Sequence, residues 1–433
     1  MKKILSILMA AMTILAVSCK KEEPTAEVAV TVLKDGVNLC IEGMTVKADN
    51  GSVVFESLTD TSGVAMFKLP AGLFEFSVSC RVTDGDYYIN YNGTSSAPIT
   101  VDTPVEVIIP VSASRTSPLI IKELYVGGCM DNNNEKNYQY DKYMIVYNNS
   151  AKTVDASKLA IAMSGPLAAS GSNAYVTNGV YSFASEGWMP AMYAMWWFAD
   201  GKKVEIEPYS QIVIAITGAV DHTKTYANSV DLSNSDFCFY CPTSGFNQAL
   251  SYPTPAYDDS SRYMQTVRFG AGTAWPIHMG QPSMFIFLQG DKTAKEMSED
   301  TANFDHTLGT AAAMSTVKVP ADLICDALES FAAGSESSST NRFPASINTG
   351  YVSYTSKAGY TIYRNVDKEA TEALSENEGK LVYNYAGAVS EDDTDPSGID
   401  AEASIANGAH IVYMDTNNST TDFHQRKVAS IKK

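Results

Sequence analysis

Residues 59–67 read TDTSGVAMF, and residues 69–76 read LPAGLFEF; these two stretches decide the fold of the first part of the chain. Asp60 and Gly63 suit a tight turn between two strands, and the Pro-Ala-Gly at 70–72 suits the next turn. Alternating apolar residues beside each turn give each strand one face to bury. The pattern therefore predicts short antiparallel strands.

The same alternation extends to both sides of these turns. Short apolar-faced segments punctuated by turn residues occur at 28–32, 44–48, 52–55, 64–67, 74–78 and 105–109. Strands of this length and spacing are typical of an all-β unit. We therefore predict a small β-sandwich over residues 28–112.

The two quoted stretches resemble the signature of carboxypeptidase-regulatory-like and transthyretin-like modules. The resemblance implies a β-sandwich that acts as a spacer or interaction domain without chemistry of its own. Cys40 and Cys80 fall inside this module and could form a bridge, although their separation in sequence does not decide the question.

A second β pattern begins with LIIKELY at 119–125. Together with stretches at 143–149, 154–162, 206–215 and 323–328, it resembles the lamin-tail-like immunoglobulin pattern. One position departs from that pattern, because Val146 stands where an acidic residue is usual. The fold class predicted for the chain is mostly β: a small N-terminal β-sandwich, then a larger immunoglobulin or lamin-tail-like β domain over 119–429 with long loop insertions.

Residues 119–429 also resemble, as a whole, an uncharacterised family of Bacteroidota outer-membrane lipoproteins, a domain of unknown function. The stretches that carry this resemblance are KELY at 122–125, DKY at 141–143, YNN at 147–149, VDLSNSDF at 230–237, NRF at 341–343, MDTNNS at 414–419 and TDF at 421–423. The resemblance implies an outer-membrane location beside a TonB-dependent transporter, and no catalytic residue.

The first residues predict export and lipidation. Two lysines precede the apolar segment 4–17, which has the length of a signal peptide. LAVSC at 15–19 resembles a bacterial lipobox, which implies a signal peptide over 1–18, a lipid on Cys19 and a tether over 19–27. KKEE at 20–23 is similar to signals for display on the cell surface. An ordinary secretory signal and a generic charged tether are the alternatives.

Composition narrows the functional classes. The 433 residues include 31 basic and 49 acidic side chains, a net charge of −18, so bulk charge does not favour nucleic acid as a partner. With 45% hydrophobic and 10% aromatic residues, the chain has the composition of a folded protein.

One segment is unusually rich in methionine and aromatic residues. MPAMYAMWWF at 189–198 has the composition either of a buried strand or of an apolar wall that contacts a ligand or partner. The candidate contact residues are Met192, Tyr193, Trp196, Trp197, Trp275 and His278. His278 lies beside Met279, so haem or metal ligation is conceivable there, although the five histidines show no metal-binding spacing.

Two further motifs have metal-binding or redox interpretations. DTDPSGID at 393–400 places oxygen ligands at Asp393, Asp395, Ser397 and Asp400, as a calcium loop does, but Ser404 stands where a bidentate acid is needed. An acidic surface loop is the alternative. CFYC at 238–241 could be two unpaired strand cysteines, a local disulfide or half of a metal site.

Helical patterns are few, and catalytic motifs are absent from the sequence. Residues 366–379 predict a helix ending at Gly379, and 321–332 could include a helical turn. No nucleophile elbow, phosphate-binding loop or dinucleotide fingerprint occurs, so we predict no enzyme activity and no cofactor.

We therefore expect a lipid-anchored, surface-exposed outer-membrane protein. It would bind a small molecule, peptide or glycan, or assist in nutrient capture, beside a TonB-dependent barrel. An adhesive or structural surface protein is the alternative, and a hydrolase is less favoured.

Overall fold

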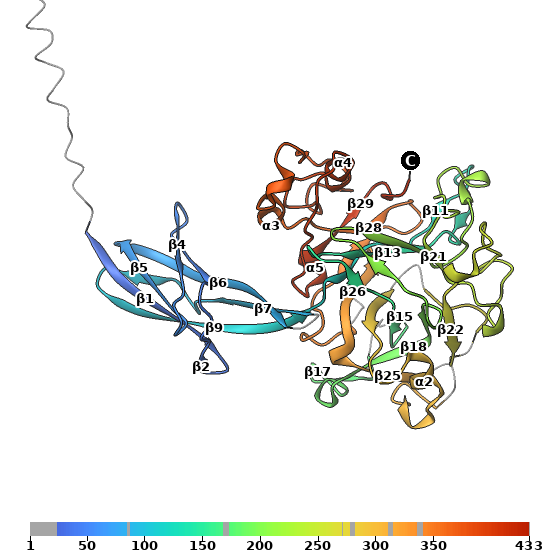
Figure 1. Cartoon of the computed structure of the whole chain (residues 1–433), viewed down its shortest axis with the longest axis horizontal. Coiled ribbons are helices and arrows are strands. Elements are labelled where there is room, and N and C mark those ends of the chain that lie inside the picture. Colours follow the sequence, from blue (N-terminus) through green and yellow to red (C-terminus); the bar gives the residue numbers. More distant parts are fainter. Residues whose placement is uncertain are drawn as a thin grey trace, which may run out of the picture. The chain divides into compact units, whose positions relative to one another are not determined.

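The chain forms two compact units. The computed structural model describes residues 24–84, 87–167, 173–270, 272–277, 282–310, 315–335 and 341–432. The first unit runs to Val82 and resumes over Asn90–Ala113, and the second comprises Thr83–Ile89 and the chain from Ser114 onward. Strands are the main regular structure in both units (Figure 1), which confirms the mostly β fold class. Cys19, its flanking residues and His278 lie outside the described residues.

Strands in the first unit follow the predicted alternation. The sheet order is β2-β1-β9-β7-β6-β3-β4, with β5 paired to β1 and β8 to β6. Val28, Val30 and Val32 of β1 are fully buried in its core. The strands are β1 Thr25–Lys34, β2 Val37–Asn38, β3 Thr45–Asp49, β4 Val54–Leu58, β5 Val64–Pro70, β6 Gly72–Asp84, β7 Tyr87–Thr94, β8 Ile99–Val101 and β9 Val105–Thr116.

Two sheets face each other in the second unit. The first, here called the β10 sheet, has the order β21-β20-β13-β10-β28-β29. Its strands are β10 Leu119–Tyr125, β13 Tyr143–Asn148, β20 Gln211–Ala215, β21 Phe237–Cys238, β28 Thr361–Arg364 and β29 Phe423–Arg426.

The second, here called the β15 sheet, has the order β24-β25-β18-β15-β23-β26-β27, with β22 paired to β18. Its strands are β15 Leu159–Ser164, β18 Trp188–Trp197, β22 Gln265–Arg268, β23 Ser283–Leu288, β24 Phe304–Asp305, β25 Thr316–Pro320, β26 Ile324–Ala332 and β27 Val352–Tyr354. Three strand pairs lie outside the large sheets: β11 Cys129–Met130 with β12 Asn137–Tyr138, β14 Val154–Asp155 with β19 Glu205–Ile206, and β16 Val176–Thr177 with β17 Val180–Tyr181.

The largest core lies between the β10 and β15 sheets. Val146 of β13 and Ile161 of β15 belong to it, so the position that departs from the lamin-tail-like pattern has an apolar, packing role. Each sheet is also covered on its outer face. A second cluster covers the β15 sheet beside helix α2 Ala294–Glu299, and a third joins the β10 sheet to the segment 366–413. Strands buried on both faces have near-continuous apolar sequences, as β13 and β15 do.

The structure shortens one predicted helix and confirms a predicted helical turn. Residues 366–379 form only the short helix α3 Lys368–Glu372 and a following turn of 3₁₀ helix. The turn expected within 321–332 is the 3₁₀ turn Ala321–Leu323, and the remainder is strand β26, which pairs with β23. Two other helices, α4 Ala401–Ala406 and α5 Ser419–Asp422, lie in the C-terminal region (Figure 1). Among the described residues, no helix combines the length and apolar character needed to cross a bilayer.

Candidate functional site

A bulge in β10 places two consecutive charged residues on the same face of the sheet. The register of β10 against β13 shifts between Ile121 and Glu123. Ile121 and Leu124 both still point into the core between the sheets. An inserted residue breaks the alternation of sides, so Lys122 and Glu123 both contact groups on the outer face.

Lys122 is fully buried. A carboxylate, an amide and three tyrosine rings surround it and form what is here called the cage. Its Nζ lies 2.8 Å from a Glu402 carboxylate oxygen and donates a hydrogen bond of 2.7 Å to Gln211 Oε1. The rings of Tyr147, Tyr363 and Tyr413 lie 5.5 to 5.8 Å away, within the range of cation–π attraction. The cage is filled by the chain's own cation and joins β10 to α4.

Glu123 anchors the end of the described chain. The Tyr143 hydroxyl donates to Glu123 Oε1 at 2.6 Å, and the Ser430 N–H donates to the same oxygen at 3.0 Å. The Ser430 hydroxyl donates to the other carboxylate oxygen. These bonds hold residues 430–432 against the β10 sheet.

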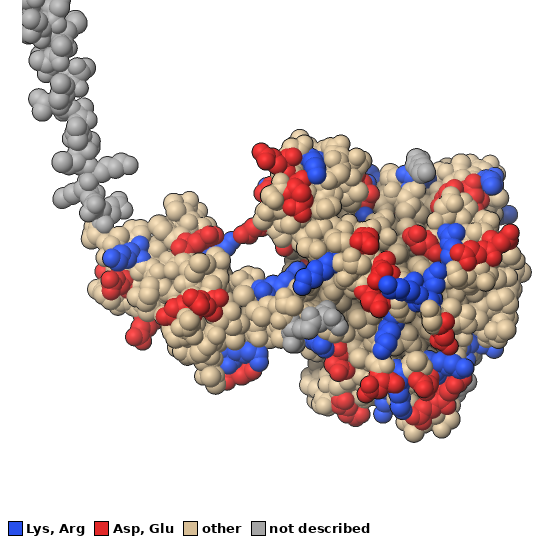
Figure 2. All heavy atoms as spheres, in the orientation of Figure 1, with Lys and Arg blue, Asp and Glu red and all other residues tan. Residues whose placement is uncertain are grey.

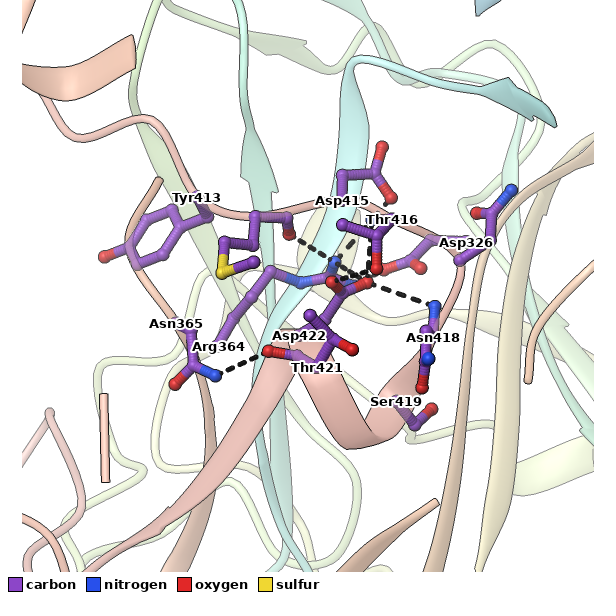
Figure 3. Close-up of polar contacts among 12 residues, drawn as sticks. Asp326, Arg364, Asn365, Tyr413, Asp415, Thr416, Asn418, Ser419, Thr421 and Asp422 are labelled. Atoms are coloured by element: carbon purple, nitrogen blue, oxygen red, sulfur yellow. Dashed lines mark hydrogen bonds and ion pairs between the residues drawn. The ribbon is translucent and has the colours of Figure 1, made fainter. Parts of the chain in front are cut away.

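A second buried charge cluster surrounds Arg364 of β28 (Figure 3). Its guanidinium pairs with Asp326 of β26 and lies 3.7 Å from an Asp415 oxygen and 3.6 Å from an Asp422 oxygen. Arg364 Nε also donates to the Ile121 carbonyl at 2.8 Å. None of the four side chains is more than 4% exposed. Burial raises the pKa of Asp422 above its usual range. The cluster ties both sheets to the loop 414–422, and its burial closes it to a dissolved substrate.

Arg342 forms a similar centre with Glu329 of β26. The pair is fully buried, and Arg342 N–H donates to Glu329 Oε2 at 2.7 Å. Arg342 Nη1 donates to the Leu167 carbonyl at 3.1 Å. Burial raises the pKa of Glu329, and the guanidinium opposes that rise. The pair holds a loop on the β15 sheet, so it is a structural contact.

The predicted aromatic wall lies in the interior of the protein. Met192, Trp196 and Trp275 are at most 4% exposed, and Trp196 stacks on Phe239 with ring centroids 4.3 Å apart. Tyr193 is half-buried and has a φ of 68°. Burial favours the buried-strand interpretation over the contact wall, because strand β18 is covered on both faces.

Trp197, another member of that set, lines a hollow. The hollow has a volume of about 350 Å³ and is also lined by Lys158, Asp200 and Lys202. Trp197 is only 5% exposed, so it offers little surface to a ligand. His278 lies outside the described residues, and the structure does not place it.

The acidic loop uses its oxygens for its own backbone. Asp395 accepts from the N–H groups of Val366 at 2.9 Å and Ser397 at 2.8 Å. Asp400 is the N-cap of α4 and accepts from Ala403 N–H. Asp393 accepts from Gln425 at 3.4 Å. These roles favour the acidic-loop interpretation over the calcium site, and no group of three metal-binding side chains is found among the residues described.

All six described cysteines are free thiols. Cys238 and Cys241 are buried, and burial raises the pKa of Cys238 to about 11. Cys40 is exposed and Cys80 is half-buried. The structure therefore corrects both disulfide hypotheses and agrees with unpaired cysteines, Cys238 in strand β21 and Cys241 just before a 3₁₀ turn.

A hollow on the second unit, called here the polar hollow, has a volume of about 640 Å³. Its residues come from β20, the segment 223–235 and the end of the chain: Gln211, Val213, Thr223, Ala227, Asp231, Asn234, Ser235, Ser430, Ile431 and Lys432. Amides and hydroxyls both donate and accept hydrogen bonds. The hollow has the size of a small-molecule site, with a more polar lining than most.

An adjacent hollow of about 470 Å³, called here the lysine hollow, shares Lys432 with the first. It is lined by Cys129, Met130, Asn134, Asn228, Lys357, Ala358, Gly359, Lys427, Val428 and Lys432. Three of these residues are basic and none is acidic. On the face shown in Figure 2, by contrast, acidic and basic side chains are interspersed.

Sequence reasoning identified part of this region without assigning it a role. The stretch 230–237 carries the family resemblance and supplies Asp231, Asn234 and Ser235 to the polar hollow. Lys357 and Lys427 had no signal in the sequence, because an isolated exposed lysine is ordinary. Only the fold brings them to one hollow.

Comparison with protein families gives one match. A family model described as "Protein of unknown function (DUF4876)" matches residues 207–430, just over half of the chain. No curated protein matches. The comparisons indicate no enzymatic family.

Solved structures give a relative of similar fold. A crystal structure of a DUF4876 family protein from Bacteroides thetaiotaomicron VPI-5482 is 20% identical, with a TM-score of 0.53, and the match covers 92% of this chain and 94% of that one. A DUF3823 family protein from Parabacteroides merdae ATCC 43184 is 13% identical, with a TM-score of 0.17, over 42% of this chain and 92% of that one. Another, from Bacteroides ovatus ATCC 8483, is 11% identical, with a TM-score of 0.16, over 44% and 99%.

Proposed function

The chain belongs to the DUF4876 family, and from this premise we propose that it is a lipid-anchored binding protein of the outer-membrane surface. Its second unit takes up a ligand at the polar hollow. It acts as an accessory to nutrient capture beside a TonB-dependent transporter.

The observation that carries the binding role is the polar hollow itself. Its volume is about 640 Å³, which is enough for a small ligand. One wall is held by Glu123 through Ser430, and Glu123 is fully buried. A wall fixed by buried hydrogen bonds loses little freedom when a ligand binds, which favours affinity.

The N-terminal sequence supports the proposed location on the outer-membrane surface. LAVSC at 15–19 has small residues before a cysteine at the end of an apolar segment. Each buried methylene of a lipid contributes about 0.8 kcal/mol, so several acyl chains would hold the protein on the membrane. KKEE at 20–23 supports display on the outer face.

Digestion of intact cells with a protease that cannot cross the outer membrane tests the proposed surface location. We expect cleavage of the wild-type protein, and protection when Lys21, Glu22 and Glu23 are replaced by alanine. Cys19→Ala should release the protein from the membrane fraction. Protection of the wild-type protein would contradict surface display.

Purification of the lipidated protein from detergent-solubilised envelopes tests the partner. We expect a TonB-dependent barrel to copurify with it. Failure to recover any outer-membrane barrel would contradict the accessory role.

Obstruction of the polar hollow tests ligand binding there. Ala227 is exposed and lines the hollow, so Ala227→Trp should fill part of it and abolish a thermal shift produced by polysaccharides from the growth medium. Ala71→Trp, at an exposed position in the first unit, is the matched control. Equal shifts in both variants would remove the hollow from the proposal.

A further inference from the structure

We propose that the ligand of this protein is an acidic glycan. Its hydroxyl-rich body occupies the polar hollow, and its carboxylate or sulfate group binds in the lysine hollow. This inference rests on the proposed function and names the class of ligand.

The two hollows are neighbours. Lys432 lines both of them, and the consecutive residues Ala227 and Asn228 line one each. Lys432 is held in place, because its Nζ donates to the Asn228 carbonyl at 2.8 Å. A ligand longer than one sugar ring can therefore touch both hollows.

The lysine hollow holds unneutralised positive charge. Among the described residues, no carboxylate lies within ion-pair distance of Lys357 or Lys427, and Lys432 bonds to a neutral carbonyl. The chain as a whole carries a charge of −18. Three basic residues around one hollow without an acid create a local positive field, which attracts an anionic group.

Backbone contacts fix the position of Lys357. Its φ is 67°, a conformation uncommon for residues other than glycine. Its N–H donates to the Gly127 carbonyl at 2.8 Å, and Gly359 N–H donates to the Gly128 carbonyl at 3.0 Å. These hydrogen bonds hold the turn beside β11, so the backbone from which the Lys357 side chain extends has a fixed position.

The polar hollow favours a carbohydrate body over a nucleotide. Its lining offers the amides of Gln211 and Asn234 and the hydroxyls of Thr223, Ser235 and Ser430. These groups match sugar hydroxyls, which donate and accept hydrogen bonds. No aromatic ring lines either hollow, so the stacking platform that nucleic-acid bases use is missing from both.

Binding of the detergent-solubilised full-length protein to three immobilised polymers tests the inference. Polygalacturonate carries carboxylates, heparin carries sulfates and carboxylates, and dextran is neutral. We expect at least one acidic polymer to bind about tenfold more tightly than dextran, as one charge-assisted contact predicts. The preference should weaken as salt rises, because salt screens exposed charges.

Variants that remove lysine charges test whether the acidic polymer binds in the lysine hollow. Lys357→Gln and Lys427→Gln together should weaken binding of the acidic polymer about tenfold, a larger loss than the same variant causes for dextran. Lys295→Gln and Lys368→Gln together remove the same charge at exposed positions elsewhere in the second unit and should have no effect. Matching melting curves for both double variants establish that they fold.

Each contrary result is distinct. Equal affinity for acidic and neutral polymers, an effect as large in the control variant, or no binding of either acidic polymer overturns the acidic-glycan inference. If the protein binds dextran and Ala227→Trp abolishes that binding, the proposed function stands and only the acidic-glycan inference fails. If the protein binds none of the three polymers and no barrel copurifies with it, both the proposed function and the acidic-glycan inference are overturned.

Discussion

Glu123, on the first strand of the larger unit, accepts two hydrogen bonds from Ser430, 307 positions later in the chain. The carboxylate is fully buried. The bulge in β10 turns it outward, so one local irregularity determines where the far end of the chain lies. That end forms a wall of both hollows.

Ser430→Ala should loosen this wall. It leaves one oxygen of the buried Glu123 carboxylate without its hydroxyl donor, which costs about 1–3 kcal/mol. We expect faster hydrogen exchange over 427–432 and weaker ligand binding. Ser298→Ala, which removes a hydroxyl bonded within α2, is the control. Unchanged exchange at 427–432 would show that Glu123 does not hold the tail.

Arg364→Met should be strongly destabilising. It leaves Asp326, Asp415 and Asp422 buried without their shared cation, and breaking a buried pair costs about 3–5 kcal/mol. Asp415→Asn is the contrast, because it lowers the excess of negative charge, and we expect a change within about 1 kcal/mol. Urea denaturation of both variants provides the measurement. Similar losses in the two would mean that the cluster is not charge-balanced in this way.

Trp196 should tolerate phenylalanine but not alanine. Its side chain is fully buried on Phe239, so Trp196→Ala should cost about 3–5 kcal/mol. Its indole N–H has no hydrogen-bond partner among the described residues, so Trp196→Phe forfeits no bond and should cost less than about 1.5 kcal/mol. Thermal denaturation compares them. A functional loss in Trp196→Phe with unchanged stability would argue for a role beyond packing.

His424 should make the protein sensitive to acid. Burial lowers its pKa from 6.5 to about 3. The unfolded chain therefore binds a proton that the folded chain does not, and stability present above pH 6.5 falls with pH by up to about 1.4 kcal/mol per unit. His424→Gln should flatten the stability profile between pH 6.5 and 4. Parallel profiles would exclude His424 as the source.

The reactivity of each cysteine thiol should follow its exposure to solvent. Cys40 is exposed, so maleimide should modify it in the native protein. Cys129, Cys238, Cys241 and Cys325 are buried and should react only in denaturant. Mass spectrometry without a reductant identifies the modified residues. Cys238 and Cys241 remaining unmodified in denaturant would indicate a disulfide between them.

Short-range patterns predicted the strands well in the first unit. The apolar alternation at 28–32 became β1, and the turn at Asp60–Gly63 precedes β5. Strand β7 was missed, because YYINYNGT shows no clean alternation. The helix expected at 366–379 is divided into α3 and a separate 3₁₀ turn at Ser375–Asn377.

Residue type alone could not separate core from site. Methionine and tryptophan suit both a buried strand and a binding wall. Strand β18 is central in its sheet, and hydrophobic clusters packed on both of its faces bury the wall. Conversely, the polar and basic residues that line the two hollows have no distinctive composition.

The sequence by itself determined the mostly β fold class, the first strands and the family resemblance, because apolar period and turn chemistry act over a few residues. Only the tertiary structure decided which residues are accessible together. Lys357, Lys427 and Lys432 come from separate segments, and they reach one hollow because β-sheet pairing and the Glu123–Ser430 contact join positions far apart in the chain. Such contacts leave no local pattern, so the candidate site emerged from the fold.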